Sequence, residues 1–394
     1  MAGVLLARAG VPAVVLEKHA DFLRDFRGDT VHPSTMEVVA DLGELDAFLR
    51  RPHQELRTVE GEVAGVRVPV ADFSHLPTAA RFLALMPQWE FLDFLAGVGA
   101  RYPEFSLRMG AEVTGLLRGA DGRATGVEGR GPDGPFRVEA DLVLGADGRG
   151  SVVRRLAGLR VRDLGAPMDV LWMRLPRRPD DPDPPLGQFA PGHVFVALPR
   201  GDYYQCGYVI PKGGAEAVRA RGIGAFRAAV AGAAPLFRDR TDALASWDDV
   251  KLLTVAVDRL DAWAAPGVLC IGDAAHAMSP IGGVGINLAI QDAVATANLL
   301  HGPLRRGRPT VAELDRVRRR RRLAVRLVQR AQVAIQDRVI GPALAGTAFR
   351  RVPLVARLLR RVPVLRRLPA RLIGMGVRME RVRSPDVHQG RASV

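Results

Sequence analysis

The segment with the clearest chemical potential is GDAAHAMSPIGGVGIN, residues 272–287, which lies between an apolar run and a long helical pattern. An acid directly after a buried strand can accept hydrogen bonds from ligand hydroxyls at the carboxyl edge of a parallel sheet, and Asp273 has that position. Gly282, Gly283 and Gly285 carry no side chains, so a flat ring can approach the backbone, and the helix N-terminus behind them favours negative charge. The alternative is a tight strand-to-helix turn that Asp273 merely caps.

Two further signals also follow apolar runs. In LVLGADGRGSVVRRLAGL, a buried strand ends at Gly145, Asp147 and Gly148, and Ser151 can cap the next helix, although ordinary turns have the same pattern. Glu17 ends the run PAVVLE, where an acid can bind both hydroxyls of an adenosine ribose in a dinucleotide fold. The alternative for Glu17 is a solvent-facing acid.

Other chemistries find little support in the sequence. His276 lies in the turn after Asp273 without a Ser or Cys partner, so we expect it to be structural. The H-E-x-x-H, C-x-x-C and G-x-S-x-G patterns are missing, which argues against zinc sites and serine hydrolases, and we expect no metal. The literal G-x-G-x-x-G at residues 129–134 lies in a polar turn that no helix follows, and we discard it.

Length and composition predict a chain of two domains, or of one domain interleaved with another. The chain has 394 residues, of which 48% are apolar and 25% charged, which excludes a disordered or collagen-like chain. Residues 302–394 hold 24 Arg against five acids, so the net charge of +14 is a C-terminal property. We expect no nucleic-acid binding, because aromatic residues are not interleaved with these arginines.

The pattern of elements predicts an α/β fold. PAVVLE, FRVEADLVLGADG and GVLCIGDAAH read as buried strands, and FSLRMG, EVTGLLR and ATGVEGR as a strand meander with turns at residues 121–122 and 132–134. Residues 165–262 change character, with strands at HVFVALP, DYYQCGYVI and LLTVAV and a helix near 214–231. Beyond residue 309 the pattern is helical and rich in Arg, and we expect basic amphipathic helices packed on the first domain.

Taken together, these motifs resemble the FAD-dependent aromatic hydroxylases, the para-hydroxybenzoate hydroxylase-like flavoprotein monooxygenases. The resemblance covers roughly residues 1–335, and GDAAHAMSPIGGVGIN is its most specific part. It implies a Rossmann-like FAD-binding domain interleaved with a β-sheet substrate domain, plus a helical C-terminal segment. The expected division is 1–62, 84–164 and 263–308 for FAD binding, 63–83 and 165–262 for the substrate domain, and 309–394 for the basic C-terminal region.

The resemblance also assigns roles to residues. It implies that Glu17 binds the ribose, Arg27 lies near the flavin and pyrophosphate, and Gln88 lies beside the ribityl chain. Asp147 and Gly148 belong to a motif that serves FAD and NAD(P)H, Gly272 and Asp273 bind the ribitol, and Asn287 contacts the pyrimidine edge of the flavin. Residues 280–283 line the flavin ring, with Pro280 and Gly282 nearest to it, and Gly285 begins the helix behind. No catalytic side chain is expected, because the cofactor carries the chemistry.

The implied activity is hydroxylation of an aromatic or other electron-rich ring with NAD(P)H and O2. Phe189, Phe195, Tyr203 and Tyr204 are candidate lining residues of the substrate pocket, although core packing is the more common role for such residues. The alternatives are an FAD-dependent reductase on the same scaffold and a non-catalytic truncated remnant.

One departure from the family pattern motivates the last alternative. Members begin with a strand and a G-x-G-x-x-G turn that lead into a helix ending like LLARAGV, whereas this sequence starts within that helix. We therefore expect in-frame DNA upstream of Met1 to encode the strand and the turn, and without them FAD binding should be weak.

Location and partners follow from composition. Cys206 and Cys270 form neither a metal spacing nor a redox pair, and no export signal is evident, so we expect a cytoplasmic protein. A small ring compound is the expected partner. Weak peripheral membrane contact through the basic C-terminus is a further expectation, and the sequence does not indicate an oligomeric state.

Overall fold

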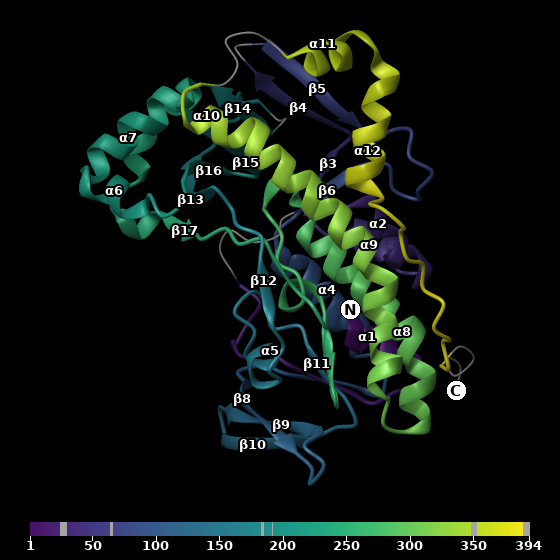
Figure 1. Ribbon diagram of the computed structural model, residues 1–394. Coiled ribbons are helices and arrows are strands. Elements are labelled where there is room, and N and C mark those ends of the chain that lie inside the picture. The colour runs from purple at the N-terminus through teal and green to yellow at the C-terminus, as the bar shows by residue number, and fades with distance from the viewer. Residues whose placement is uncertain (24–29, 64–65, 183–184, 191, 348–352, 389–394) are drawn as a thin grey trace.

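The computed structural model describes residues 1–23, 30–63, 66–182, 185–190, 192–347 and 353–388. Two long helices, α8 (Gly285–Arg306) and α9 (Val311–Ile335), pack side by side through the middle of the molecule (Figure 1). A small meander lies at one end of the molecule, and a large sheet flanked by helices lies toward the other. Arg27, one of the predicted FAD contacts, lies outside the described residues.

The predicted buried strands form parallel pairs, as expected for an α/β fold. β1 (Ala13–Leu16) runs parallel to β7 (Phe105–Arg108). β11 (Val143–Gly145) runs parallel to β20 (Val268–Cys270), and β20 also pairs with the short antiparallel strand β19 (Ala264–Ala265). Parallel strands end at a common edge, so the segments after β11 and β20 lie next to each other.

The meander is confirmed in part. β8 (Glu112–Arg118), β9 (Ala124–Gly131) and β10 (Gly134–Glu139) form an antiparallel sheet, and the discarded G-x-G-x-x-G motif is its second turn. The strand in FSLRMG was expected in this meander, but it is β7 and pairs with β1. An alternating pattern indicates a strand but not its partner, because either pairing buries the same face.

Helices enclose the β1–β7 pair. The core here joins α1 (Ala2–Arg8), α2 (Pro33–Asp41), α3 (Leu45–Leu49), α4 (Gln88–Gly99) and α8, around fully buried Leu5, Met36, Phe48 and Val294. α5 (Val152–Leu156) follows β11. Two small sheets complete this part, β3 (Gln54–Leu56) with β6 (Leu83–Leu85) and β2 (Thr30–Val31), and β12 (Val161–Asp163) with β18 (Asp258–Leu260).

Two distant stretches of the chain build one seven-stranded sheet. Its order is β17-β13-β16-β15-β14-β4-β5, so strands from residues 58–72 continue a sheet whose other strands come from residues 168–253. The bounds are β4 (Thr58–Val63), β5 (Val66–Asp72), β13 (Met168–Pro176), β14 (Leu186–Ala190), β15 (His193–Arg200), β16 (Tyr203–Pro211) and β17 (Lys251–Leu253). β4 crosses the expected boundary at residues 62 and 63, and the domain division stays a proposal.

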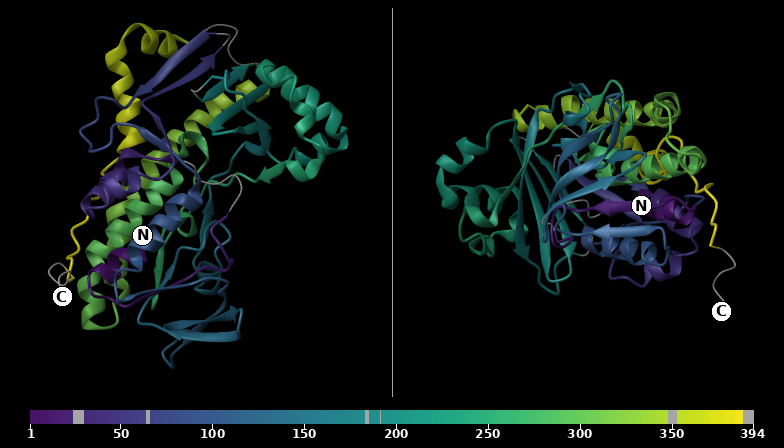
Figure 2. Two further views of the ribbon diagram at one scale, coloured as in Figure 1. Left: turned by 180° about the vertical axis from the view of Figure 1, so that it is seen from behind. Right: turned by 90° about the horizontal axis from the view of Figure 1, so that it is seen from below.

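The two faces of this sheet have different neighbours. α6 (Ala215–Ala220) and α7 (Gly222–Ala233), where one helix was expected, lie on one face (Figure 2). Phe195 and Tyr204 point to this face and pack against Phe237, so both are core residues, as is common for such side chains. The other face packs against Ile281, which belongs to the segment after Asp273.

The C-terminal region departs from the expected run of helices on the first domain. α9 does pack on α8, but after the π turn Gln336–Ile340 and α10 (Gly341–Leu344), helices α11 (Leu354–Arg361) and α12 (Arg367–Gly374) lie against β5 of the seven-stranded sheet. Residues 376–388 are not helical and return to α1, where Val387 N–H donates to Arg8 O. None of the described helices combines the length and the apolarity needed to cross a membrane.

Candidate functional site

The ends of β11 and β20 bring the two strongest sequence signals together. Ile271 N–H donates to Gly145 O at 2.9 Å, which holds the two strand ends in register. Beyond them, Arg149 Nε donates to Asp273 Oδ2 at 3.0 Å, and Arg149 Nη2 donates to Met278 O at 3.2 Å. The motif GADGRGS and the motif that begins at Gly272 are therefore one structural unit at the carboxyl edge of the parallel strands.

Asp273 lies at the surface of this unit. Its side chain is 30% exposed and that of Arg149 is 31% exposed. Among the described residues, Oδ2 has Arg149 as its hydrogen-bond partner and Oδ1 has none. A Cβ placed on Gly285 would lie 3.9 Å from Oδ1, so the start of α8 lies directly beside this carboxylate. Asp273 can accept hydrogen bonds from a ligand that follows the start of α8.

The glycine turn between Pro280 and α8 has a backbone that only glycine adopts easily. Gly282 and Gly283 have φ values of 78° and 61°, in the left-handed region. A Cβ on Gly283 would lie 3.4 Å from Thr30 Oγ1. The turn therefore presents backbone without side chains at the N-terminus of a 22-residue helix, a place that favours negative charge.

Asn287 joins this turn to the segment that begins α2. Its Oδ1 accepts hydrogen bonds from His32 N–H at 3.0 Å and from Thr35 Oγ1 at 2.7 Å, and its Nδ2 donates to Gly283 O at 3.3 Å. The side chain is buried and its oxygen already has two donors. One Nδ2 hydrogen remains for a ligand, so the predicted contact with the flavin stays a prediction beside this structural role.

Asp147 is engaged with the start of α5, the helix that follows it. It accepts hydrogen bonds from Ser151 Oγ and from Val153 N–H, the latter at 3.0 Å. Ser151 in turn accepts from Arg154 N–H at 3.0 Å, which confirms the predicted cap of α5. Gly148, with a φ of 82°, allows the turn between them. A direct role of Asp147 and Gly148 toward a cofactor stays a prediction.

Two other predicted residues lie at the ends of their elements. Glu17 directly follows β1, at the carboxyl end of that strand, and one of its oxygens accepts from His19 N–H at 2.9 Å. Gln88 is the first residue of α4 and is half-buried. Their contacts to a cofactor also stay predictions.

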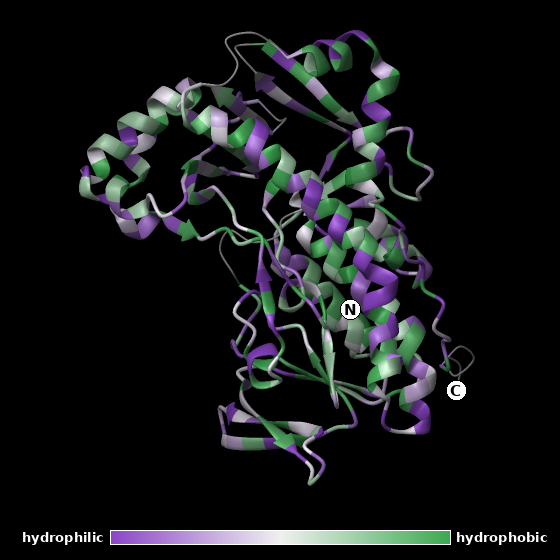
Figure 3. Cartoon of the chain, in the orientation of Figure 1, coloured by the Kyte–Doolittle hydropathy of each residue, from purple (hydrophilic) through white to green (hydrophobic). Residues whose placement is uncertain are grey.

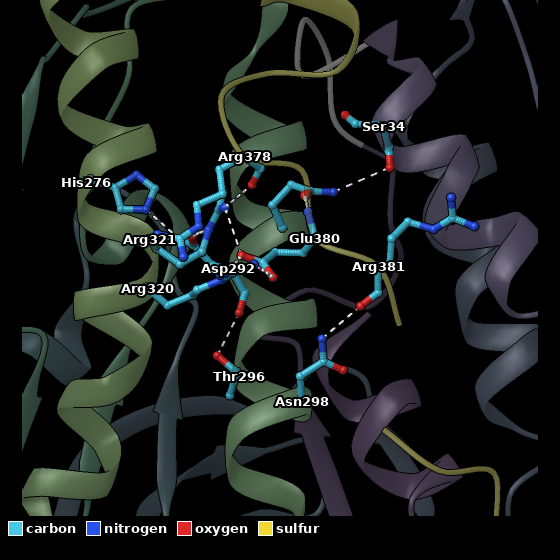
Figure 4. Close-up of polar contacts among 11 residues, drawn as sticks. Ser34, His276, Asp292, Thr296, Asn298, Arg320, Arg321, Arg378, Glu380 and Arg381 are labelled. Carbon is cyan, nitrogen blue, oxygen red and sulfur yellow. Dashed lines mark hydrogen bonds and ion pairs between the residues drawn. The ribbon is translucent and has the colours of Figure 1, made fainter. Parts of the chain in front are cut away.

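A buried charge network, which the sequence did not reveal, holds the turn at Gly272, and Figure 4 shows its members His276, Asp292 and Arg321. Asp292 of α8 is fully buried and accepts hydrogen bonds from Gly272 N–H at 3.1 Å and from Arg321 Nε at 2.9 Å. His276 Nε2 lies 2.5 Å from Asp292 Oδ2, the oxygen that also accepts from Gly272 N–H, and the His276 ring packs on Trp263 with centroids 4.9 Å apart. His276 is thus structural, as expected.

The charge of Asp292 is retained despite its burial. Burial raises the pKa of this carboxyl group, but the contacts with His276 and Arg321 outweigh burial and hold its pKa below the usual value. The ionised group therefore adds stability at neutral pH, and this stability is lost as the pH falls through the lowered pKa. A lone acid among Leu288, Ile290, Ala293 and Val294 was the sequence signal that could have revealed it.

His32 is a second residue that the sequence analysis missed. It is fully buried, its Nδ1 lies 2.8 Å from Ile373 O, and burial lowers its pKa to about 4. The ring is therefore neutral at physiological pH, and Nδ1 carries the proton because its neighbour is a carbonyl. Nε2 is then an acceptor, without a partner among the described residues, and a Cβ on Gly283 would lie 3.7 Å from it.

Comparisons with known proteins agree with this geometry. Residues 1–331 match the family described as FAD binding domain. A 6-methylpretetramide 4-monooxygenase from Streptomyces rimosus is 34% identical over 390 residues, which are 98% of this chain and 92% of that protein. An anhydrotetracycline monooxygenase from the same species is 30% identical over 307 residues, 73% of this chain, although the match spans only 58% of that protein.

A solved structure gives a similar result. The OxyS anhydrotetracycline hydroxylase from Streptomyces rimosus superposes with a TM-score of 0.73 at 26% identity, and the match covers 96% of this chain and 74% of that one.

The buried network predicts that Asp292→Asn is strongly destabilising. The substitution keeps the size of the side chain but removes the charge between His276 and Arg321, and the loss of one partner of a buried ion pair costs about 3–5 kcal/mol. Denaturant unfolding at neutral pH should show this loss in the free energy of unfolding, and the difference from the unsubstituted protein should shrink in acid.

The matched control is Asp261→Asn. Asp261 lies 3.5 Å from Arg160 in a pair with both side chains exposed, and such pairs contribute about 0–1 kcal/mol. Equal stabilities of the two variants would contradict a structural role of the Asp292 charge.

Proposed function

This chain belongs to the FAD binding domain family, and we propose from that premise that it is an FAD-dependent monooxygenase that hydroxylates an aromatic or other electron-rich ring with NAD(P)H and O2. The observation that carries the proposal is the joined unit of Asp273, the glycine turn and the start of α8. The similarity to a named monooxygenase over 98% of the chain supports the same reaction class.

The residues of this unit fit FAD. Asp273 offers ribityl hydroxyls a carboxylate oxygen, Oδ1, that has no partner among the described residues, and the turn at Gly282 and Gly283 leaves room where a Cβ would meet Thr30. The neutral ring of His32 places a buried acceptor beside the same turn. The carboxylate of Asp273 suits the hydroxyls of the ribityl chain. The glycine turn and the N-terminus of α8 suit the flat flavin ring at the end of that chain, which carries negative charge when reduced.

FAD, when bound, supplies the redox and oxygen chemistry, and the net reaction takes NAD(P)H, a proton, O2 and the ring compound to NAD(P)+, water and the hydroxylated ring. The chain itself binds and orients. Asp273 holds hydroxyls at the sheet edge, the glycine turn allows close approach, and the positive end of α8 stabilises negative charge on the ring that it faces.

The residues proposed to bind the cofactor are those that the sequence suggested. They are Glu17, Arg27, Gln88, Asp147, Gly148, Gly272, Asp273, Pro280, Gly282, Gly283, Gly285 and Asn287. Of these, Asp273 has the strongest geometric support, because its carboxylate is partly exposed and lies beside both the turn and the helix start. Gly272 acts through its φ of 58°, which turns the chain after β20.

We place the substrate against the face of the seven-stranded sheet that meets Ile281. Val170, Val194 and Val209 are buried on this face, where Ile340 and Ala343 of the π turn and α10 cover them and Phe189 and Ile281 pack at the margin. Phe195 and Tyr204 cannot line the pocket, because they point to the opposite face. Tyr203 stacks on Arg174 instead, with the guanidinium 4.9 Å from the ring centre. An apolar wall suits an uncharged ring compound.

Two further proposals concern location and contacts. We place the protein in the cytoplasm, because Cys206 and Cys270 are both buried and unpaired, and burial raises the pKa of both thiols, that of Cys270 to about 12. We also propose weak peripheral membrane contact through the basic C-terminal region, residues 309–394.

Asp273→Ala should lose most of the bound FAD while the protein stays folded. The substitution deletes charge-assisted hydrogen bonds to the cofactor, each worth about 1.5–3 kcal/mol, so the Kd for FAD should rise about tenfold to a hundredfold or more. Stability should change little, since the ion pair with Arg149 is partly exposed. FAD titration and thermal unfolding measure the two effects. Asp202→Ala, at an exposed turn of the large sheet, is the control, and equal FAD affinity of the two variants would leave Asp273 as a turn cap only.

The reaction itself is tested by the mass of the product. With FAD, NADH or NADPH and isotopically labelled dioxygen, a monooxygenase adds one labelled oxygen atom, whereas the alternative reductase adds only hydrogen. The name of the 34% identical relative contains the compound 6-methylpretetramide, which is therefore the first substrate to test. Oxidation of NADH or NADPH with a hydrogenated product that carries no labelled oxygen would favour the reductase. A chain that binds no flavin would favour the non-catalytic alternative.

A further inference from the structure

Helix α11, the turn Pro363–Arg366 and helix α12 expose an unusual number of aliphatic side chains, and we call this surface the C-terminal face. Leu354 is 73% exposed and Leu368 is 69% exposed. The exposed aliphatic residues of the face are Leu354, Val355, Leu358, Val362, Val364, Leu368 and Leu372. Isolated exposed leucines are common, but a series of exposed aliphatic residues along adjoining elements marks an interaction surface.

The packing of the helices fixes the outward direction of these side chains. In α12, Ala370 and Gly374 are buried, and a Cβ on Gly374 would lie 2.7 Å from Leu76 Cδ1, so the helix meets the body of the protein very closely on that side. Leu368 and Leu372, one turn apart, therefore face solvent. Hydrophobic and hydrophilic residues both appear along α11 and α12 in Figure 3.

α11 also has an inner and an outer side. Ala356 and Leu359 are half-buried, whereas Leu354, Arg357, Leu358 and Arg361 follow the spacing i, i+3, i+4 and i+7 and share one exposed side of the helix. Aliphatic and basic side chains are therefore interleaved on the exposed side of α11.

The charge around this face has one sign. Residues 338–379 contain ten Arg and no acidic residue. Where the structure describes this segment, no carboxylate forms an ion pair with Arg357, Arg360, Arg361, Arg367 or Arg371. The neighbouring segment differs, because Arg320 and Arg381 pair with Glu380 and with Asp41 and Glu37, respectively. Within the described structure, the arginines of α11 and α12 therefore lack carboxylate partners and share their surface with the exposed aliphatic residues.

We propose that the C-terminal face binds anionic lipid surfaces, with Leu354, Leu358 and Leu368 inserted among acyl chains and the arginines on lipid phosphates. Exposed aliphatic residues beside arginines are typical of helices that lie in the membrane interface, and each arginine near an anionic surface adds attraction. The proposal deepens the peripheral contact proposed above and does not depend on the oxygenase activity.

Other occupants fit the face less well. A second copy related by twofold symmetry would bring two sets of unpaired arginines together, which opposes association. Nucleic acid would account for the charge but not for exposed leucines and valines, since it is bound by stacking aromatic residues, which α11 and α12 do not contain. An anionic lipid surface satisfies both the charge and the aliphatic side chains.

The experiment is co-sedimentation of the full chain with phosphatidylcholine vesicles that contain phosphatidylglycerol, and with vesicles of phosphatidylcholine alone. We expect binding to the anionic vesicles only, and binding should weaken as salt is raised. Leu354→Ser combined with Leu368→Ser keeps every arginine and should weaken binding at least about tenfold. Arg357→Gln combined with Arg361→Gln should weaken it by about fivefold for each residue.

The control is Leu323→Ser, because Leu323 is 50% exposed on α9, outside the C-terminal face. This variant should bind as the unsubstituted protein does. Equal binding to neutral vesicles, no binding to anionic vesicles, or an equal effect of all three leucine substitutions would overturn the proposal. A dimer in light scattering that the Leu354 and Leu368 substitutions dissociate, without vesicle binding, would assign the face to a second copy. FAD binding and product mass do not enter these readouts, so failure here leaves the oxygenase proposal unaffected.

Discussion

The close approach of the turn at Gly272 to helix α8 is the constraint on which the site depends. A Cβ at Gly272 would lie 2.9 Å from Ala289 Cβ, and its φ of 58° lies in the left-handed region, so glycine is required there on two grounds. Asp292, one turn further along the helix, accepts the Gly272 N–H and also binds Arg321. The turn is thus fixed by the backbone conformation of Gly272, by its contact with α8 and by its hydrogen bond to the charged Asp292. The backbone of Asp273, the next residue, is fixed with it.

The Asp292 carboxylate also links distant parts of the chain, so that their stability is interdependent. Arg321 reaches Asp292 from α9, and its Nη1 also donates to Arg378 O in the C-terminal segment. Glu380 in that segment binds Arg320, and its backbone N–H donates to Gln291 of α8. Since buried charges need all their partners, the C-terminal segment is part of the support for the turn although it lies far from Asp273 in sequence.

The sequence predicted the residues of the site that directly follow strands. It could not predict the residues whose role depends on contacts with distant segments of the chain. Apolar runs and glycines placed Asp273, Asp147 and the glycine turn, because a strand end and a left-handed turn leave local traces in the sequence. Arg321, by contrast, is one of five consecutive arginines at residues 318–322, and nothing in that run tells which one is buried. The partner of β7 and the face toward which Phe195 points were also undetermined, since both depend on sheet order rather than on local pattern.

The arginines of the C-terminal region divide into two classes that composition cannot distinguish. Arg320, Arg321 and Arg381 have carboxylate partners on α8, α2 or the C-terminal segment itself, and they join elements of the fold. The arginines of α11 and α12 have no such partners in the described structure and share their helices with exposed leucines. A genome-wide preference for arginine would add charge to both classes alike, but it would not by itself place a series of aliphatic side chains in solvent beside the arginines of α11 and α12. The coincidence of the two features on α11 and α12 is therefore better explained by an anionic, apolar surface as the partner of that face than by composition.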